Sequence, residues 1–213
     1  MAKIKAGILS KVSGKVAGVV GGTWKGTNYL RELVKPSNPN TPLQQAQRSK
    51  MAFVVASARQ VVGDVLNPYL NKFCKTMSGY NWFCRENIKR LGGTPLAFTN
   101  VPVLSFGTLG TGAIANETLA SDGAIKLTAV PSVPAGHSLK LVYGFVEDTG
   151  DWYGVGEQEN PVVNTAYGST VGIKSSGTAN LAAVCFFADF DANGVLQAIS
   201  ASITEGFEEI SFD

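Results

Sequence analysis

The sequence has 213 residues, of which 45% are hydrophobic and 16% are charged, with 24 glycines and a single histidine. The apolar share is typical of globular proteins, which excludes a disordered polyelectrolyte and a small disulfide-stabilised scaffold. The net charge of +2 is the sum of two opposite halves: residues 1–100 carry 15 Lys and Arg against 3 Asp and Glu (+12), and residues 101–213 carry 3 against 13 (−10). Such halves can attract each other within one subunit, or join the basic part of one subunit to the acidic part of the next.

Residues 1–41 predict a basic, glycine-rich β-arm that ends in a proline-rich connector. Six glycines between residues 7 and 26 exclude a stable helix, and the β-forming residues of 23–31 predict a strand paired with a partner near 15–20. Two strands alone are marginally stable in water, so we expect this segment to pack on another surface; a mobile tail is the alternative. Three prolines in 35–42 then predict an extended connector.

Residues 42–94 predict a helical hairpin. The threonine-proline pair at 41–42 is a helix start signal, and apolar side chains recur at helical spacing from Leu43 to Val65. Asn67 and Pro68 then start a second helix, on which the same spacing continues to Leu91. Two glycines and a proline end that helix.

Residues 95–213 predict an antiparallel β-sandwich of immunoglobulin-like kind, because short β-runs follow one another with turn residues and no helical interlude. The runs are 126–130, 139–146, 151–155, 169–174, 181–188 and 195–203. The Cys and Trp marks of antibody domains are absent, so the strand topology stays open. The expected fold class is therefore α+β, with the arm, the hairpin and the sandwich in that order.

Export, a membrane span and a cysteine-bound metal are all unexpected from the sequence. Four lysines interrupt the first 15 residues, where a signal peptide needs an unbroken apolar run. The longest stretch without charge, 91–116, contains two prolines and five glycines and is typical of loops and strands. The three cysteines have no metal-binding spacing, and we expect small buried thiols at Cys74, Cys84 and Cys185.

Three stretches near the start of the chain resemble a known family. These are Ser13–Val20, the triplet Trp24–Gly26, and 35–42 with Gln45, Gln47 and Arg48 after it. They are similar to the opening of an uncharacterised domain-of-unknown-function family of Bacteroidota and their phages and prophages, and the proline-glutamine-arginine stretch also resembles small virion-associated proteins of tailed phages. The resemblance implies the same order of parts and a location in a virion, or in the cytoplasm before assembly. It implies no reaction and no catalytic residue.

Enzymatic activity is not predicted. His137 is the only base available to a serine or cysteine nucleophile, and it lies in a turn without a nucleophile motif. Acidic residues that could form a glycosidase pair surround Gly150 and Gly154, as the polar edge of a loop would; they are Glu147, Asp148, Asp151, Glu157 and Glu159.

The sequence offers two weak candidate ligand sites, one for calcium and one for a sugar. Asp189, Asp191 and Asn193, followed by Gly194, have the alternating oxygens of a calcium loop, but no carboxylate stands at the twelfth position and β-runs flank the motif, so a hairpin turn is preferred. No other cofactor is expected. Trp152 and Tyr153 are expected to be exposed beside the acidic loop, where they would offer a surface for stacking against a sugar.

The function expected from the sequence is that of a structural subunit that assembles with copies of itself, and with other virion proteins, through arm exchange and basic-to-acidic contacts. The candidate arm contacts are Trp24, Tyr29 and Leu30. The candidate electrostatic contacts are Arg31, Arg48, Arg59, Arg85, Lys89 and Arg90. The alternatives are a glycan- or protein-binding module on a basic tether, and a nucleic-acid-binding protein whose basic start contacts phosphates.

Overall fold

The computed structural model describes residues 2–4, 14–24, 27–35, 37, 39–110, 112–114, 124–168 and 177–212. The chain divides into two compact units, Met1–Pro42 and Leu43–Asp213. The described residues form two helical segments, 42–70 and 79–90, and several antiparallel sheets, so the α+β class is confirmed. The strand predicted at 169–174 lies outside the described residues.

The first unit, which we call the arm, is a four-stranded antiparallel sheet. Its strands are β1 (Ala2–Ile4), β2 (Gly14–Val16), β3 (Val19–Trp24) and β4 (Thr27–Glu32), in the order β1-β4-β3-β2. The single strand predicted over 23–31 is wrong, because Trp24 pairs with Thr27 across a hairpin. In the sequence, β-forming residues stand on both sides of the lysine-glycine pair at 25–26 and suggest one strand, although this glycine is a hairpin signal.

The second unit is built on a long central strand. β12 (Gly177–Phe190) pairs along one edge with β9 (Ser138–Glu147), which pairs in turn with β10 (Trp152–Glu159). The other edge of β12 pairs with three short strands, β13 (Leu196–Ile199), β14 (Ile203–Thr204) and β15 (Glu208–Phe212). We call these strands the main sheet.

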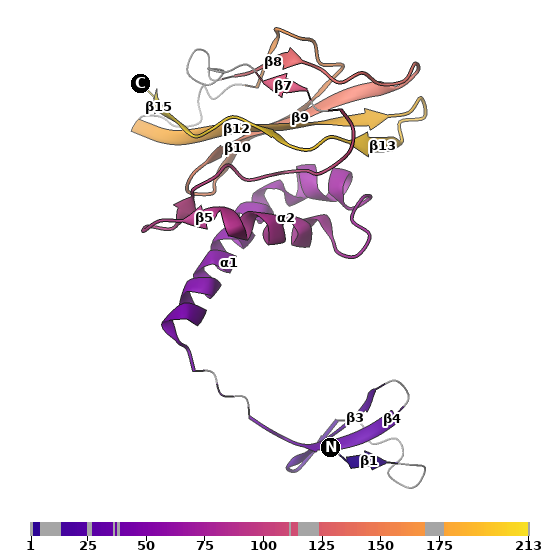
Figure 1. The fold of residues 1–213 in the computed structure, drawn as a ribbon, viewed down its shortest axis with the longest axis vertical. Coiled ribbons are helices and arrows are strands. Elements are labelled where there is room, and N and C mark those ends of the chain that lie inside the picture. The colour runs from indigo at the N-terminus through magenta and orange to yellow at the C-terminus, as the bar shows by residue number, and fades with distance from the viewer. Residues whose placement is uncertain are drawn as a thin grey trace. The chain divides into compact units, whose positions relative to one another are not determined.

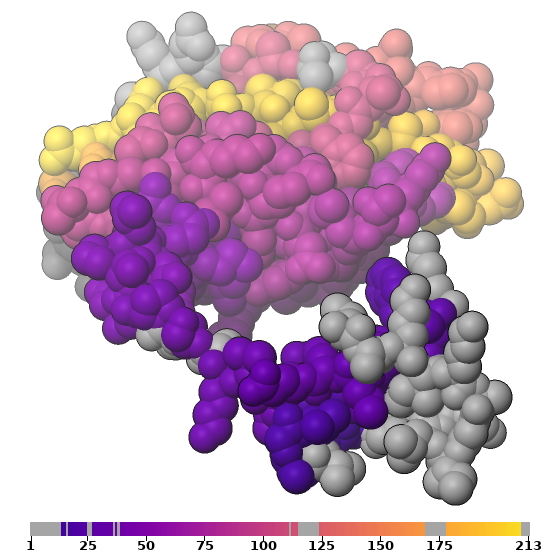
Figure 2. Space-filling view, turned by 60° about the horizontal axis from the view of Figure 1, so that its bottom comes forward, coloured from indigo at the N-terminus to yellow at the C-terminus, as the bar shows by residue number. Residues whose placement is uncertain are grey.

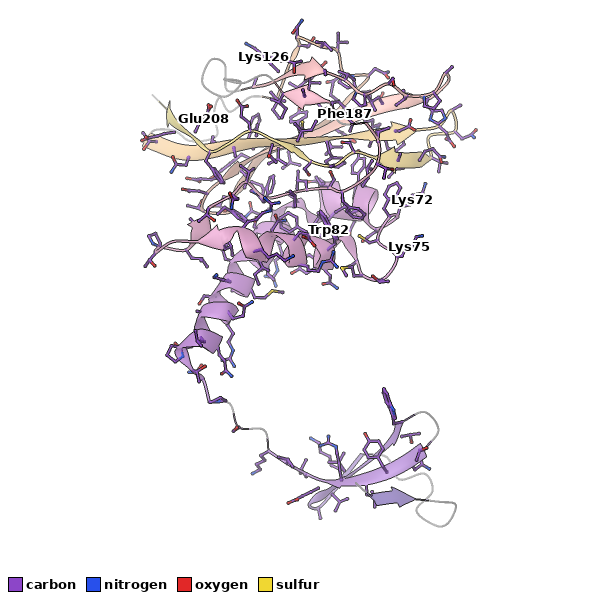
Figure 3. The ribbon with its side chains drawn as sticks, in the orientation of Figure 1. Lys72, Lys75, Trp82, Lys126, Phe187 and Glu208 are labelled. Atoms are coloured by element: carbon purple, nitrogen blue, oxygen red, sulfur yellow. The ribbon has the colours of Figure 1, made fainter. Side chains whose placement is uncertain are left out.

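Both faces of the main sheet are covered, which makes the second unit a three-layer structure (Figure 1). Residues 182, 184, 186 and 188 of β12 join one buried cluster with the helices. Residues 181, 183, 185 and 187 join the other with a small sheet of β7 (Ala113–Ile114), β8 (Ile125–Ala129) and β11 (Ala166–Tyr167). Phe187 accordingly points toward the small sheet, whereas Trp82 lies in the helix layer (Figure 3). Alternation along β12 therefore unites the helices and the β-part in one unit.

The helix layer starts where the sequence predicts, at Pro42, with α1 (Pro42–Val61). The predicted restart at Pro68 is wrong, because the chain continues as a π-helical segment, Val62–Leu70, with Pro68 inside it. The wider π turn accommodates the proline ring, which in an α-helix clashes with the carbonyl four residues earlier.

The second helix starts later than predicted. α2 (Gly79–Asn87) follows Ser78, whose hydroxyl accepts a hydrogen bond from the amide of Asn81 at 3.2 Å. A 3₁₀ turn, Ile88–Arg90, then leads into the small β5–β6 hairpin (Leu91–Gly92 with Ala97–Phe98).

Asn87 joins α2 to the irregular segment that contains Val103. Its side chain is fully buried, donates to the carbonyls of Val103 at 2.9 Å and Phe83 at 3.1 Å, and accepts from the amide of Val103 at 2.8 Å. We expect Asn87→Ala to lower the free energy of unfolding by at least about 2 kcal/mol, because it leaves buried backbone groups without partners. Urea denaturation measures this, and exposed Asn81→Ala is the control; equal effects of the two substitutions would contradict the assignment.

Candidate assembly surfaces

The arm has no buried apolar core among its described residues. Neither buried cluster includes a residue of the arm, and among the arm residues whose burial is described only Gly21 is buried. Trp24 is 70% exposed and Val34 is 63% exposed. The described strands of the arm therefore carry apolar surface that the arm itself does not bury.

One face of the arm sheet gathers cations and aromatic rings. The register places Val20 opposite Lys15 and Arg31, Gly22 opposite Tyr29, and Trp24 opposite Thr27. A Cβ on Gly22 would lie 2.9 Å from the Tyr29 hydroxyl oxygen, so the tyrosine ring lies over this glycine. We call Lys15, Trp24, Tyr29 and Arg31 the basic-aromatic face.

The opposite face of the arm differs in character. Val19 lies opposite Glu32, and Thr23 donates to the Asn28 side-chain oxygen at 2.6 Å. Leu30 is on this face too, so the predicted arm contacts are divided: Trp24 and Tyr29 share a face with Arg31, and Leu30 does not. Glu32 is thus separated by the sheet from the cations, and no described side chain of the basic-aromatic face is a carboxylate.

The other predicted electrostatic residues lie in the helix layer, which forms one broad surface of the second unit (Figure 2). Arg48 and Arg59 are exposed on α1. Arg85 pairs with Glu86 at 2.9 Å, and Lys89 is 3.6 Å from the same carboxylate. Arg90 is half-buried and donates to the carbonyl of Val101 at 3.1 Å, where it holds the local backbone.

An acidic depression lies where β10 meets the π-helical segment. It has a volume of about 230 Å³ and is lined by Asp64, Val65, Val142, Val155, Gly156 and Glu157. The Tyr69 hydroxyl donates to Glu157, and burial together with this carboxylate raises the pKa of Tyr69 well above its ordinary value. The Lys140 ammonium is 3.0 Å from Glu159 and 3.9 Å from Glu157, so one cation is shared by these two carboxylates.

This depression is not predicted from the sequence. Asp64 and Glu157 are far apart along the chain and come together only through packing of the helix layer on β10. The one available signal is the exposed acidic end of β10, since carboxylates on an edge strand are typical of surfaces that exclude indiscriminate strand pairing.

The predicted sugar-stacking pair does not form an exposed platform. Trp152 is only 8% exposed, and its indole nitrogen donates to the Ser57 hydroxyl at 2.8 Å, so its exposure was wrongly predicted. Tyr153 is half-buried and donates to Glu147 at 3.1 Å, and burial raises its pKa to about 12. The glycan-binding alternative thereby loses its stacking surface.

The residues of the candidate calcium loop build a hairpin. Asp191 accepts from the amides of Asn193 and Val195, both at 2.9 Å, and these backbone hydrogen bonds, that of Val195 first, lower the pKa of Asp191. Asp189 is buried and lies 2.9 Å from the His137 ring. Within the described parts of the chain, no three His, Cys, Asp or Glu side chains are placed to hold a metal ion.

The described helices include none that is long and apolar enough to cross a membrane. In the comparison with known protein families, the model of a family of unknown function, DUF6266, matches residues 11–139. No curated protein and no solved structure matches the chain. The match spans more than half of the chain and includes strands β2 to β4 of the arm, both helices and the start of the β-part. The chain therefore belongs to the DUF6266 family.

Proposed function

We propose that the protein is a non-enzymatic structural subunit that assembles with copies of itself into a repeating particle, tube or filament, as a phage or prophage virion component. The observation that carries the proposal is the arm: a small sheet with exposed apolar and aromatic side chains and without a buried apolar core in its described residues. Such a sheet gains stability when a second molecule covers it.

Charge supports a second copy of the chain as the molecule that covers the arm. Residues 1–42 carry seven Lys and Arg against one Glu, a net charge of +6, whereas residues 101–213 carry −10. Exposed carboxylates of the second unit lie in strands at both edges of its main sheet, at Glu157 and Glu159 on one side and Glu209 on the other. A neighbouring copy thus offers the opposite charge, and contacts between unlike surfaces of identical subunits continue without end unless they close into a ring.

In the proposed assembly, the arm reaches a neighbouring copy, and an edge strand of the arm pairs with that copy through backbone hydrogen bonds. β1 and β2 are the edge strands of the arm sheet, and edge strands carry backbone groups free to pair with another chain. The helix layer supplies further contacts through its cations. Residues 95–213, for which we keep the prediction of an immunoglobulin-like sandwich, face the outside of the particle except at the acidic strands that contact a neighbouring copy.

The test is the size and shape of the purified full chain. Electron microscopy and light scattering at low ionic strength are expected to show large ordered particles, and their amount is expected to fall steeply as salt screens the basic-to-acidic contacts. A mass of 22.4 kDa, that of one chain, at every concentration and salt level would contradict the proposal.

Nucleic-acid binding is the second candidate, and the basic-aromatic face favours it. Cations beside exposed rings are the features with which proteins hold single strands, through phosphate contacts and base stacking. Under this alternative a single-stranded oligonucleotide quenches Trp24 fluorescence at low salt, with an affinity that falls steeply as salt rises. No binding at about 50 mM salt would exclude it.

A further inference from the structure

The two halves of α1 have different surroundings. From Phe53 onward α1 packs on the core: Ser57 receives the Trp152 indole hydrogen bond, and Gln60 accepts from the Trp152 amide at 2.8 Å. Before Phe53 no residue of α1 belongs to either buried cluster or packs against one, and Leu43 is 83% exposed. We call residues 43–52 the α1 overhang. Figure 1 shows this end of α1 extending away from α2 and the main sheet.

The overhang continues the buried stripe of the helix. Leu43 and Gln47 stand at helical spacing from Val54, Ala58 and Val61, which are fully buried. The side chains that face the core in one half of α1 thus share their direction with exposed side chains in the other half. A short helical segment that joins no buried apolar cluster gains little from packing and is marginal in water, so a covering partner would stabilise this half of α1.

The chemistry of the overhang limits what its partner can be. The first turn of α1 has no acidic residue, and the first carboxylate along the chain after Pro42 is Asp64. Arg48 and Lys50 flank the stripe, with Met51 43% exposed beside them. The surface that fits is therefore hollow, partly apolar and acidic.

We propose that the α1 overhang of one copy docks in the acidic depression of a second copy. The depression of about 230 Å³ has valine walls and is large enough for one leucine side chain, and we assign it to Leu43. Asp64 and Glu157 lie in its wall, and Glu159 lies two residues further along β10. Arg48 of the docked helix then faces Glu159 of the other copy. This contact rests on the proposed self-assembly and is separate from the arm.

The contact joins two different surfaces of the same chain. Each subunit gives its overhang to one neighbour and receives the overhang of another, so the contact propagates in one direction. A variant that damages only the overhang still receives a helix, and a variant that damages only the depression still gives one. Two variants whose changes do not compensate each other can therefore form one contact together but cannot form a chain of contacts, whereas exchanged charges restore both contacts.

The experiment uses charge reversal in the full-length chain. Arg48→Glu and Glu159→Lys are each expected to raise the concentration needed for assembly at least about tenfold, and the double variant is expected to return toward the wild type. Glu159 is chosen over Glu157 because Glu157 holds the Tyr69 hydroxyl. The controls are the same charge changes at exposed positions outside both proposed contacts, Lys75→Glu and, on the face of the arm opposite the basic-aromatic face, Glu32→Lys (Lys75 in Figure 3).

Sedimentation velocity gives the readout, and amide hydrogen exchange over residues 43–52 gives a second one. Exchange is expected to be fast in the Arg48→Glu variant and slow in the wild-type assembly. A mixture of the two single variants is expected to assemble as the double variant does, because every contact between unlike chains in it is either the wild-type pair or the exchanged charge pair. Leu43→Asp, which does not alter the depression, is expected to behave as Arg48→Glu does.

The outcomes separate this inference from the proposed function. If Arg48→Glu and Leu43→Asp assemble like the wild type while a chain without the arm does not, the docked helix is wrong and self-assembly stands. If the single variants lose assembly but the double variant does not recover, Glu159 is not the partner of Arg48, and the docking stated here is wrong. If the wild-type chain never assembles, both proposals fail.

Discussion

A chain that lacks residues 2–34 is expected to remain monomeric at concentrations at which the full chain assembles. The deletion removes the arm, with its exposed Trp24 and all but one of the cations of residues 1–42. It leaves both buried clusters of the second unit intact, so the remaining chain keeps its fold. Sedimentation velocity reads the change in mass, and an unchanged far-UV circular dichroism signal from the helices shows that the fold persists.

A matched pair of substitutions tests whether the arm acts through its basic-aromatic face. Arg31→Glu reverses a charge on the basic-aromatic face, while Glu32→Lys reverses one on the opposite face of the same strand, at the next residue. We expect Arg31→Glu to weaken assembly at least about tenfold and Glu32→Lys to leave it within about threefold. Equal effects of the two substitutions would show that the arm does not act through the basic-aromatic face.

Phe186→Ala is expected to lower the free energy of unfolding by about 3–5 kcal/mol. Phe186 is fully buried on the helix side of β12, and its ring meets that of Tyr69 edge to face with centroids 5.5 Å apart. Removing the ring leaves a cavity between the main sheet and the helix layer. Because the two layers share this core, we expect them to unfold together in a single transition that the substitution moves as a whole.

Urea denaturation followed by two probes tests this expectation. Tryptophan fluorescence reports on Trp82 and Trp152, which are both buried in the cluster shared by the helices and the sheet. Circular dichroism reports on the helices. Val195→Ala, at a position that is 48% exposed, is the control and is expected to change stability by less than about 0.5 kcal/mol. Separate helix and sheet transitions would contradict a shared core.

The elements with local signals could be predicted from the sequence. The start of α1 needs only the threonine-proline pair, and the strands at 126–130, 139–146 and 181–188 are observed within a few residues as β8, β9 and β12. The apolar run of 181–188 is continuous because both of its faces are buried, an arrangement in which the usual alternation of apolar and polar residues disappears.

The features that depend on packing between distant segments could not be predicted. Pro68 ends a helix by local rules, yet here the chain widens to a π turn and continues. Trp152 follows an acidic turn in the sequence, which predicts a surface position. It is buried instead, and its indole N–H donates a hydrogen bond to Ser57 on α1. The basic-aromatic face can be recognised only when the strand register is known. The acidic depression can be recognised only when Asp64 is known to lie beside β10.

The central claim is that the arm finds its counter-charge on another copy of the chain, and isotope-mixed cross-linking tests it directly. Equal amounts of ¹⁴N- and ¹⁵N-labelled chains are mixed, allowed to assemble and treated with a carbodiimide, which couples a lysine amine to a carboxylate in contact with it. Links between lysines of the arm and carboxylates of residues 101–213 are predicted to join light and heavy peptides about as often as like ones. Links found only within one isotope would place the arm on its own chain and contradict the account.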